Sequence, residues 1–320
     1  MKALRLTSLT GPSALELVDV DEPVGADLVH IRVGAAGVNY PDLLLMRGEY
    51  QGRVEPPFVP GSEVAGTVVS APAGSGWSAG DRVMALPGIG GYAERVAVAP
   101  GLVLRTPDVL HDTEAVALLA NHQTAYFSLV VRARLEPRET VVVLGAAGGV
   151  GTAAIQVASA LGARVIGVVH REGADDFVRE VGADEVVPLR DGWAAQVREL
   201  TGGRGADIVI DPVGGDAFDD AVRCLAHDGR LVVVGFAGGG IPSVKVNRLL
   251  LRNVGVLGAG WGEALRADPT LLAVVAGGVD DLVVGGLRPA VTQRAPLADG
   301  ASAVEQLAAG GVLGKIVLEP

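Results

Sequence analysis

The sequence predicts an α/β protein in which a doubly wound parallel sheet is combined with a second, mostly β domain. Strand-like apolar runs alternate with helical stretches from residue 140 to residue 257, as in a parallel sheet with crossover helices. A glycine-dense loop follows the first of these runs, at residues 145–151. Residues 1–118 consist instead of short alternating runs split by Gly, Pro, Asp and Ser, which is typical of antiparallel β-structure.

Composition narrows the class of protein. The 320 residues allow two domains of ordinary size, and 46 glycines are near twice the usual share of roughly 7%, which fits many short turns. A net charge of -11 argues against a nucleic-acid or anionic membrane surface. The single cysteine, Cys224, favours a reducing location. With no recognisable signal peptide or membrane-spanning run, we expect a cytoplasmic protein.

The first domain contains a stretch, residues 38–66, in which loop signals and hydrogen-bonding side chains are concentrated. Strands are predicted around it, at residues 15–20, 28–33, 63–70 and 94–99. Its polar side chains are those of Asn39, Tyr40, Asp42, Arg47, Tyr50, Ser62 and Glu63. Because binding and catalytic groups concentrate on loops, we expect part of the site here. A short helix is predicted over residues 43–47, with Asp42 as its N-terminal cap and not as an acid.

The central stretch, residues 140–172, predicts a strand, a loop, a helix and a second strand in that order. In the dinucleotide-binding fingerprint G-x-G-x-x-G, the glycines allow a tight turn, close approach of the backbone to a pyrophosphate and close packing of the helix on the strand. These positions hold Ala146, Gly148 and Gly151, so the first departs from the pattern. Gly149 and Val150 complete the loop. A dinucleotide site is therefore predicted, and a tight turn without a ligand is the alternative.

The end of the second strand, residues 164–169, indicates which dinucleotide is bound. A site for NADH normally ends this strand in an acidic residue that binds the ribose 2′-hydroxyl. Here Val169 is followed by His170 and Arg171, and a guanidinium suits a 2′-phosphate. NADPH is therefore predicted. The alternatives are that Arg171 is an ordinary solvated residue or that Glu172 serves the ribose.

Four further strands complete the predicted sheet, at residues 185–188, 208–211, 230–234 and 254–257. Helices are expected at residues 194–200 and 216–225. The loops after the fourth and fifth strands of this sheet fall at its carboxyl edge, where ligands bind in such sheets. Cofactor contacts are therefore expected from Val213, Gly214, Gly235 and Phe236.

Several separated motifs together carry a family resemblance. GVNYPDLLLMRGEY, PGSEVAG, LGAAGGVG, DPVGG and VGFAGGGIP occur in this order along the chain. They resemble the zinc-free quinone oxidoreductase branch of the medium-chain dehydrogenase/reductase superfamily, and DPVGG with AGWG is most similar to its quinone oxidoreductase-like subgroup. The resemblance implies a Rossmann domain, residues 121–262, inserted in a GroES-like catalytic domain of residues 1–120 and 263–320. It also implies a homodimer that pairs near residues 254–257.

The same resemblance implies the reaction site. It puts Asn39 and Ser62 near the nicotinamide, with Tyr40 and Tyr50 lining the acceptor pocket, and it makes Thr124 a contact of the nicotinamide end. From the residues alone, two structural roles remain open as alternatives to contact with the substrate. Asn39 could cap a loop, and Tyr50 could be a packing residue. His122, beside Thr124, is more often a structural group than a proton relay.

No metal site is predicted. Asn39 and Ser62 stand where zinc-dependent relatives carry a ligand cysteine and a ligand histidine, and the five histidines show no ligand spacing. Without a metal, hydride transfer to a conjugated acceptor is easier than alcohol oxidation, because the arriving charge is delocalised onto an oxygen that needs only hydrogen-bond donors. The prediction is an NADPH-dependent reductase of a quinone or an α,β-unsaturated carbonyl. An enoyl-CoA or acryloyl-CoA type reductase and a non-catalytic NADPH-binding sensor are the alternatives.

Overall fold

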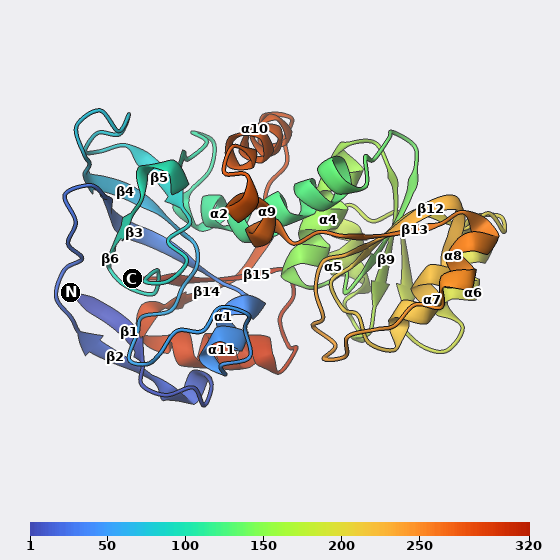
Figure 1. The fold of residues 1–320 in the computed structure, drawn as a ribbon, viewed down its shortest axis with the longest axis horizontal. Coiled ribbons are helices and arrows are strands. Elements are labelled where there is room, and N and C mark those ends of the chain that lie inside the picture. The colour runs from blue at the N-terminus through green and yellow to red at the C-terminus, as the bar shows by residue number, and fades with distance from the viewer. The chain divides into compact units, whose positions relative to one another are not determined.

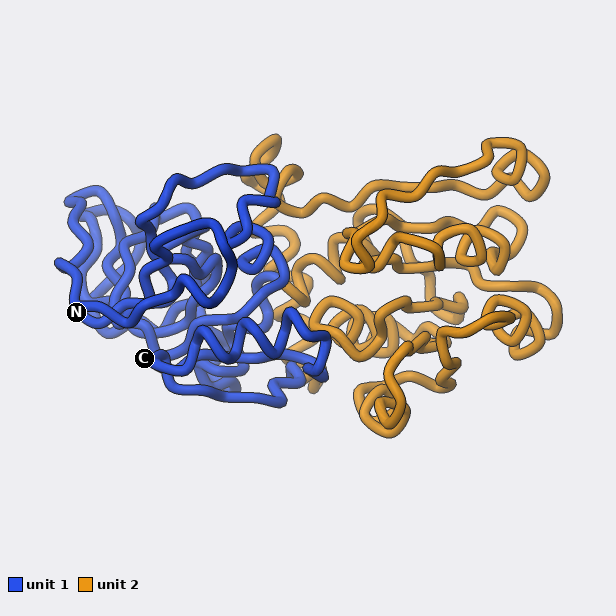
Figure 2. The backbone as a smooth tube through the Cα atoms, turned by 90° about the horizontal axis from the view of Figure 1, so that it is seen from below, with its two compact units in different colours: residues 1–120, 289–320 blue, residues 121–288 orange.

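The computed structural model describes residues 1–320, and the chain divides into two compact units, which Figure 2 distinguishes by colour. Unit 1 comprises Met1–Ala120 and Pro289–Pro320, and unit 2 comprises Asn121–Arg288. The chain was expected to rejoin the first domain at residue 263, but it does so at Pro289. Residues 263–288 belong to unit 2 because helix α10 (Leu271–Val284) packs on α3 (Gln123–Tyr126). The packing is close enough that Gly278 has no room for a side chain against the Tyr126 ring.

Unit 1 is the predicted mostly β, GroES-like domain, and it is built on a seven-stranded sheet. The strand order is β14-β15-β3-β4-β5-β7, and β6 pairs with β3. Strands β1 and β2 form a separate antiparallel pair. The strands are β1 (Lys2–Leu6), β2 (Leu15–Asp19), β3 (Val29–Val38), β4 (Val64–Ser70), β5 (Arg82–Ala85), β6 (Arg95–Val98), β7 (Val103–Arg105), β14 (Val291–Pro296) and β15 (Lys315–Glu319).

The C-terminal segment completes this sheet. Strand β15 pairs antiparallel with β3, and Ile316 lies opposite Val38. Strand β14 pairs parallel with β15. The sheet therefore joins the two ends of the sequence within one unit, and residue 315 comes to lie beside the end of β3.

Helix α1 (Tyr40–Met46) begins earlier than the predicted helix over residues 43–47. Its N-cap position is held by Asn39, with a proline in the first turn, where the missing N–H of proline costs nothing. The prediction that Asp42 is the cap residue was therefore wrong. Its carboxylate instead accepts the backbone N–H of Asn39 at 2.9 Å from inside the first turn. The other helical segments of unit 1 are η1 (Pro12–Ala14), η2 (Pro100–Leu102), α2 (Asp112–Ala117), η5 (Leu297–Asp299) and α11 (Gly300–Ala308).

Unit 2 contains the predicted doubly wound sheet, shown in Figure 1. Six parallel strands follow the order β10-β9-β8-β11-β12-β13, which is the 3-2-1-4-5-6 order of a Rossmann fold. The strands are β8 (Thr140–Leu144), β9 (Arg164–Val169), β10 (Glu185–Pro188), β11 (Ala206–Asp211), β12 (Leu225–Val233) and β13 (Gly255–Gly258). All residues of β8 are buried, as expected for a strand covered on both faces. The fold-class prediction is confirmed.

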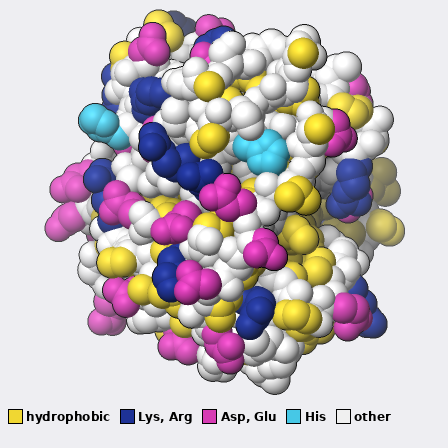
Figure 3. All heavy atoms as spheres, turned by 90° about the vertical axis from the view of Figure 1, so that its left-hand side faces the viewer, with side chains coloured by type: hydrophobic (Ala, Val, Ile, Leu, Met, Phe, Trp, Pro, Cys, Tyr) yellow, Lys and Arg dark blue, Asp and Glu magenta, His cyan; other side chains and the backbone are white.

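Helices connect these strands in the expected alternation. They are α4 (Gly149–Ala160), α5 (Asp175–Glu180), α6 (Trp193–Leu200), α7 (Ala217–Cys224) and α8 (Val246–Arg252). Helices α9 (Trp261–Ala267) and α10 follow the last strand, β13. None of the helices in the chain is long and apolar enough to cross a bilayer. On the face of the molecule in Figure 3, acidic and basic side chains are interspersed.

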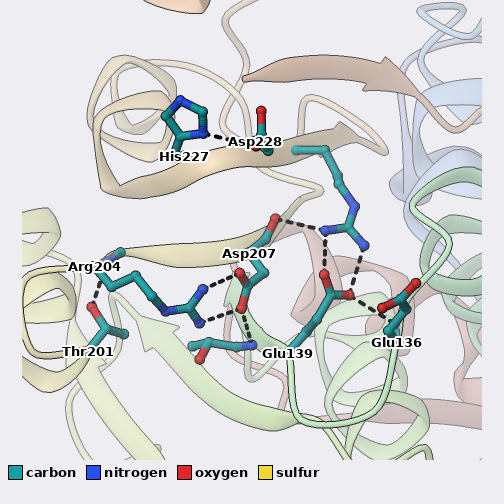
Figure 4. Close-up of polar contacts among 10 residues, drawn as sticks. Glu136, Glu139, Thr201, Arg204, Asp207, His227 and Asp228 are labelled. Carbon is teal, nitrogen blue, oxygen red and sulfur yellow. Dashed lines mark hydrogen bonds and ion pairs between the residues drawn. The ribbon is translucent and has the colours of Figure 1, made fainter. Parts of the chain in front are cut away.

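The amino edge of the parallel sheet is held by ion pairs (Figure 4). Glu139, labelled in Figure 4, accepts two hydrogen bonds from Arg230 of β12, at 2.6 and 2.8 Å. Arg230 also donates to the carbonyl of Ala133. Arg204 forms a second two-point contact with Asp207, which in turn accepts the backbone N–H of Thr140 at the start of β8.

Two π-helical segments flank α3. They are η3 (Leu118–His122) and η4 (Phe127–Arg132). Such segments are rare in proteins and often occur at functional sites. Thr124, the predicted nicotinamide contact, lies on α3 between them and is half-buried.

Candidate active site

The glycine loop compensates for its departure from the dinucleotide fingerprint. The left-handed turn falls on Gly145, with φ of 58°, one residue before Ala146. Ala146 is fully buried, and its methyl group occupies space that Gly167 of β9 leaves open. A Cβ at position 167 would lie 3.2 Å from the Ala146 Cβ. Alanine is therefore compatible with the turn because the positive φ is supplied by its neighbour.

The remaining glycines keep helix α4 close to the loop. A Cβ on Gly151 would lie 2.2 Å from the Gly145 carbonyl oxygen, and one on Gly149 would lie 2.2 Å from Nδ2 of Asn121. Gly148 is different, because it is exposed and the nearest atom to its Cβ would be 3.4 Å away. No side chain caps the N-terminus of α4. Unpaired N–H groups and the positive end of the helix dipole therefore face an open surface, which suits an anion.

At the end of β9, Val169 is buried, His170 is exposed and Arg171 is half-buried. The Nη1 atom of Arg171 is buried and has no hydrogen-bond partner within the protein. Buried donors of this kind are normally satisfied, and a cationic one favours an anionic acceptor. The residues present therefore fit a phosphate group at this strand end.

The loops after β11 and β12 pack on each other next to the glycine loop. The buried Asp211 carboxylate accepts the N–H groups of Val213 and Gly214, at 2.9 and 2.8 Å, and burial raises its pKa. The Phe236 ring lies against Gly214, where a Cβ would be 2.9 Å from the ring. A Cβ on Gly145 would likewise lie 2.9 Å from Val213. The structure thus brings the predicted residues of these three loops together at the carboxyl edge.

Unit 1 contains a buried polar array formed by Asn39, Glu63 and Lys315. The Lys315 ammonium forms an ion pair with Glu63 Oε1 and donates to Asn39 Oδ1 at 2.6 Å. Asn39 Nδ2 donates to the same Glu63 oxygen at 2.8 Å, and the other Glu63 oxygen accepts the backbone N–H of Ala120 at 2.6 Å. All three side chains of the array are buried.

The sequence analysis did not identify Lys315 as a site residue. The signal that was available is a single charged residue at the start of a buried strand, because such a charge needs a partner. Glu63 was identified only as one of the polar side chains of residues 38–66. Its contact with Lys315 depends on β15 pairing with β3 and β3 pairing with β4, which no local pattern reveals.

Asp42 forms a second buried group beside this array. Its carboxylate accepts hydrogen bonds from the Tyr92 hydroxyl, at 3.1 Å, and from the side chain of Ser62. Burial raises the pKa of Asp42 to about 6; the negative charge of Glu63 acts in the same direction, and the Ser62 hydrogen bond acts against it. Burial and the Asp42 charge raise the pKa of Tyr92 well above its usual value. Ser62 is thus connected to a buried carboxylate.

The other predicted residues occupy less polar surroundings. Tyr50 and Tyr40 are half-buried and pack against the apolar core of unit 1. His122 Nε2 lies 2.9 Å from Gln156 Oε1 of α4. The predicted residues therefore fall into two groups. Asn39, Tyr40, Tyr50 and Ser62 belong to unit 1, and the others belong to unit 2.

The donor set does not fit a catalytic zinc ion. No group of three or more His, Cys, Asp or Glu side chains is arranged to hold a metal. At Asn39 and Ser62, where zinc-dependent relatives carry ligands, the neighbouring carboxylate of Glu63 already has the Lys315 ammonium as its counter-ion. A divalent ion there would have to displace that ammonium.

Comparison with known proteins identifies the family. Residues 25–108 match the family described as alcohol dehydrogenase GroES-like domain, and residues 149–276 match that described as zinc-binding dehydrogenase. The chain is 40% identical to quinone oxidoreductase-like protein 2 of Bos taurus over 82% of this chain and 76% of that protein. The chain belongs to the medium-chain dehydrogenase/reductase superfamily. The resemblance found in the sequence is thereby confirmed, and the chain is an oxidoreductase.

Solved structures agree with this membership. A probable oxidoreductase from Mycobacterium abscessus has 55% identity and a TM-score of 0.94, over 100% of this chain and 99% of that chain. The quinone oxidoreductase of Thermus thermophilus, solved alone and in complex with NADPH, has 38% identity and a TM-score of 0.86, over 100% of both chains.

Proposed function

We propose that this protein is an NADPH-dependent reductase that transfers hydride to a quinone or an α,β-unsaturated carbonyl without zinc. The observation that carries the proposal is the buried array of Asn39, Glu63 and Lys315, in which the ammonium pairs with the Glu63 carboxylate and Asn39 retains a second N–H. The quinone oxidoreductases among its relatives support the acceptor class. The buried, unpaired Cys224 fits a reducing, cytoplasmic location.

The cofactor is proposed to bind through the residues named above. The diphosphate lies on the backbone of Gly148, Gly149, Val150 and Gly151, with Ala146 shaping the turn, and the 2′-phosphate is held by His170 and Arg171. Val213, Gly214, Gly235 and Phe236 line the edge that the cofactor follows. Ser62 and Thr124 contact its nicotinamide end. When bound, NADPH supplies the hydride.

Each proposed catalytic side chain has a distinct task. Asn39 donates its second N–H to the acceptor oxygen as negative charge develops there. The Tyr50 phenol returns a proton to the reduced product, and Thr124 orients the nicotinamide ring. Because the acceptor is conjugated, its oxygen needs hydrogen-bond donors and no Lewis acid.

The cofactor preference is tested with Arg171→Ser. We expect the wild type to show a lower KM for NADPH than for NADH. In the variant the ratio of the two KM values should fall about 10- to 100-fold, because that is the effect of losing one charge-assisted hydrogen bond. The matched control is Arg190→Ser, which removes an exposed arginine after β10 and should leave both constants unchanged. A wild type that uses NADH as well as NADPH contradicts the assignment.

The reaction is tested by following NADPH absorbance with 1,4-benzoquinone, 9,10-phenanthrenequinone, a simple enone and crotonyl-CoA. We expect turnover with a quinone or the enone, and a fall in kcat of about 100-fold in Asn39→Ala, as for the loss of an oxyanion donor. Asn247→Ala, an exposed asparagine of α8, is the control. Turnover of crotonyl-CoA alone would favour the CoA-ester reductase, and no oxidation with any acceptor would favour a non-catalytic NADPH-binding protein.

The protein is also proposed to be a homodimer that pairs through β13. This strand is at the open edge of the six-stranded sheet, and unpaired sheet edges readily pair with another chain. The adjacent helix α8 exposes apolar side chains, with Leu250 and Leu251 each 76% exposed. Light scattering on the purified protein should give the mass of two chains, and Leu250→Asp with Leu251→Asp should lower it. A monomer mass for the wild type contradicts this.

A further inference from the structure

The orientation of the Asn39 amide is dictated by two neighbours of opposite chemistry. An amide oxygen and an amide nitrogen have nearly the same shape, so packing alone does not decide which way the group faces. A lysine ammonium has donors and no acceptor, and an ionised carboxylate has acceptors and no donor. Lys315 therefore requires the Asn39 oxygen on its side, and Glu63 requires the nitrogen on the other.

We infer that Lys315 is a positioning residue, which together with Glu63 holds the Asn39 amide with one N–H directed away from both and available to an acceptor oxygen. With Oδ1 bonded to the ammonium and one Nδ2 hydrogen bonded to the carboxylate, the remaining polar group is a hydrogen-bond donor. A reversed amide would present lone pairs to a developing anion. The use of the free N–H rests on the proposed function; the orientation itself does not.

The array is built so that none of its members moves easily. Glu63 lies directly against Gly37 of β3, where any Cβ would collide with its carboxylate, and its second oxygen is held by the N–H of Ala120. Lys315 begins β15, whose register on β3 sets Ile316 opposite Val38, next to Asn39. Bonding of the ammonium to Oδ1 also polarises the amide and strengthens its N–H groups as donors.

The charges within the array balance each other. The Lys315 and Glu63 side chains are 4% and 0% exposed, so neither charge is screened by solvent. Without the ammonium, the Glu63 carboxylate would be an uncompensated negative charge beside the position where the acceptor oxygen becomes negative. Asp42 is the other acidic group that the array faces.

The test is a mutant cycle that combines changes to the Glu63–Lys315 pair with a change to Asn39. Lys315→Met alone leaves Glu63 unpaired and endangers folding, so the perturbation is the neutral pair Glu63→Gln with Lys315→Met, made with and without Asn39→Ala. We expect the neutral pair to lower kcat about 10-fold or more, with the KM for NADPH within twofold of the wild type. In the Asn39→Ala background the same pair should have no further effect on kcat. Lys315→Arg, which keeps charge and donors, should restore most of the activity.

The second readout is independent of turnover. The side-chain amide signals of Asn39, assigned by their loss in Asn39→Ala, are recorded by ¹H–¹⁵N spectroscopy of the isotope-labelled protein. We expect slow hydrogen exchange in the wild type, and shifted or doubled signals with faster exchange in the neutral pair. Unchanged amide signals, or kcat losses that add in the cycle, overturn the inference. If the wild type reduces no acceptor, the proposed function fails while the amide signals still decide the orientation.

Discussion

Asp42 and Lys315 lie in the same buried region but have different partners. Lys315 has a carboxylate as its direct partner. Asp42 has hydrogen-bond donors but no directly paired cation, so desolvation raises its pKa to about 6. A carboxyl group of this kind makes stability depend on pH in the range where ordinary aspartates have finished titrating.

The pH dependence of stability is predicted from this shift. Between pH 4 and 6 the folded protein binds a proton at Asp42 that the unfolded chain releases. This contribution is complete below the unfolded pKa of 3.8 and is lost as pH rises through about 6, an effect of about 3 kcal/mol. As pH rises from 4 to 6, the wild type should therefore lose stability relative to Asp42→Asn. The free energy of unfolding of both proteins, measured by urea titration at each pH, checks this.

A second buried carboxyl group should contribute in the same way. Asp280 of α10 also has its pKa raised to about 6, first by burial and then by the charge of Asp281, and Asp280→Asn should give a dependence of the same sign. A difference between wild type and Asp42→Asn that stays constant from pH 4 to pH 7 contradicts the prediction.

At the scale of elements, the junction of β8, the glycine loop and α4 combines two requirements at different glycines. Gly151 is needed by the fold, because a side chain there would collide with the Gly145 carbonyl. Gly148 is needed by the proposed cofactor, because its surface is open in the protein itself. Replacing each glycine by alanine adds one methyl group and should distinguish the two roles.

Gly151→Ala and Gly148→Ala form a matched pair. We expect Gly151→Ala to lower the free energy of unfolding by about 1–3 kcal/mol, since overpacking forces the backbone apart. Gly148→Ala should leave the free energy of unfolding within about 0.5 kcal/mol of the wild type. It should weaken NADPH binding about 10-fold or more, because the new methyl group would stand where the pyrophosphate is proposed to approach. For each variant, calorimetry measures the affinity for NADPH and urea titration measures the free energy of unfolding. Equal effects of the two variants on stability would contradict this division of roles.

At the scale of the whole molecule, the chain forms one discontinuous and one continuous unit, each with its own core. Residues 289–320 supply β14, β15 and the Lys315 ammonium to unit 1, so the array depends on both ends of the sequence. In unit 2, the charged contacts of Figure 4 lie at the amino edge of the sheet, and the proposed cofactor residues lie at its carboxyl edge.

This separation of edges predicts that stability and cofactor binding respond independently to mutation. Glu139→Ala removes the two-point partner of Arg230, both side chains being 20% exposed, and should lower the free energy of unfolding by about 1–3 kcal/mol without changing the KM for NADPH. Glu263→Ala breaks an exposed pair with Arg266 and should cost less than about 0.5 kcal/mol. A KM change of tenfold in Glu139→Ala would show that the two edges are coupled.

Local patterns in the sequence were sufficient to determine the parallel sheet of unit 2, because fully buried strands appear as continuous apolar runs and each βα turn carries its own glycines. The spacing of Gly148 and Gly151 likewise predicted the loop that is proposed to bind the dinucleotide. The mostly β character of residues 1–118 followed from alternation and turn residues. The expected start of α1 was displaced by three residues because Asn39, and not Asp42, takes the cap position.

Only the tertiary structure decided the composition of the buried array and the extent of the units. Asn39 and Lys315 are 276 residues apart in the chain, and they meet because β15 pairs with β3 in one particular register. Residues 263–288 joined unit 2 because α10 packs on α3. Hydrophobic periodicity specifies an element from its own residues, whereas the partner of a buried charge is specified by strands that pair across the whole length of the chain.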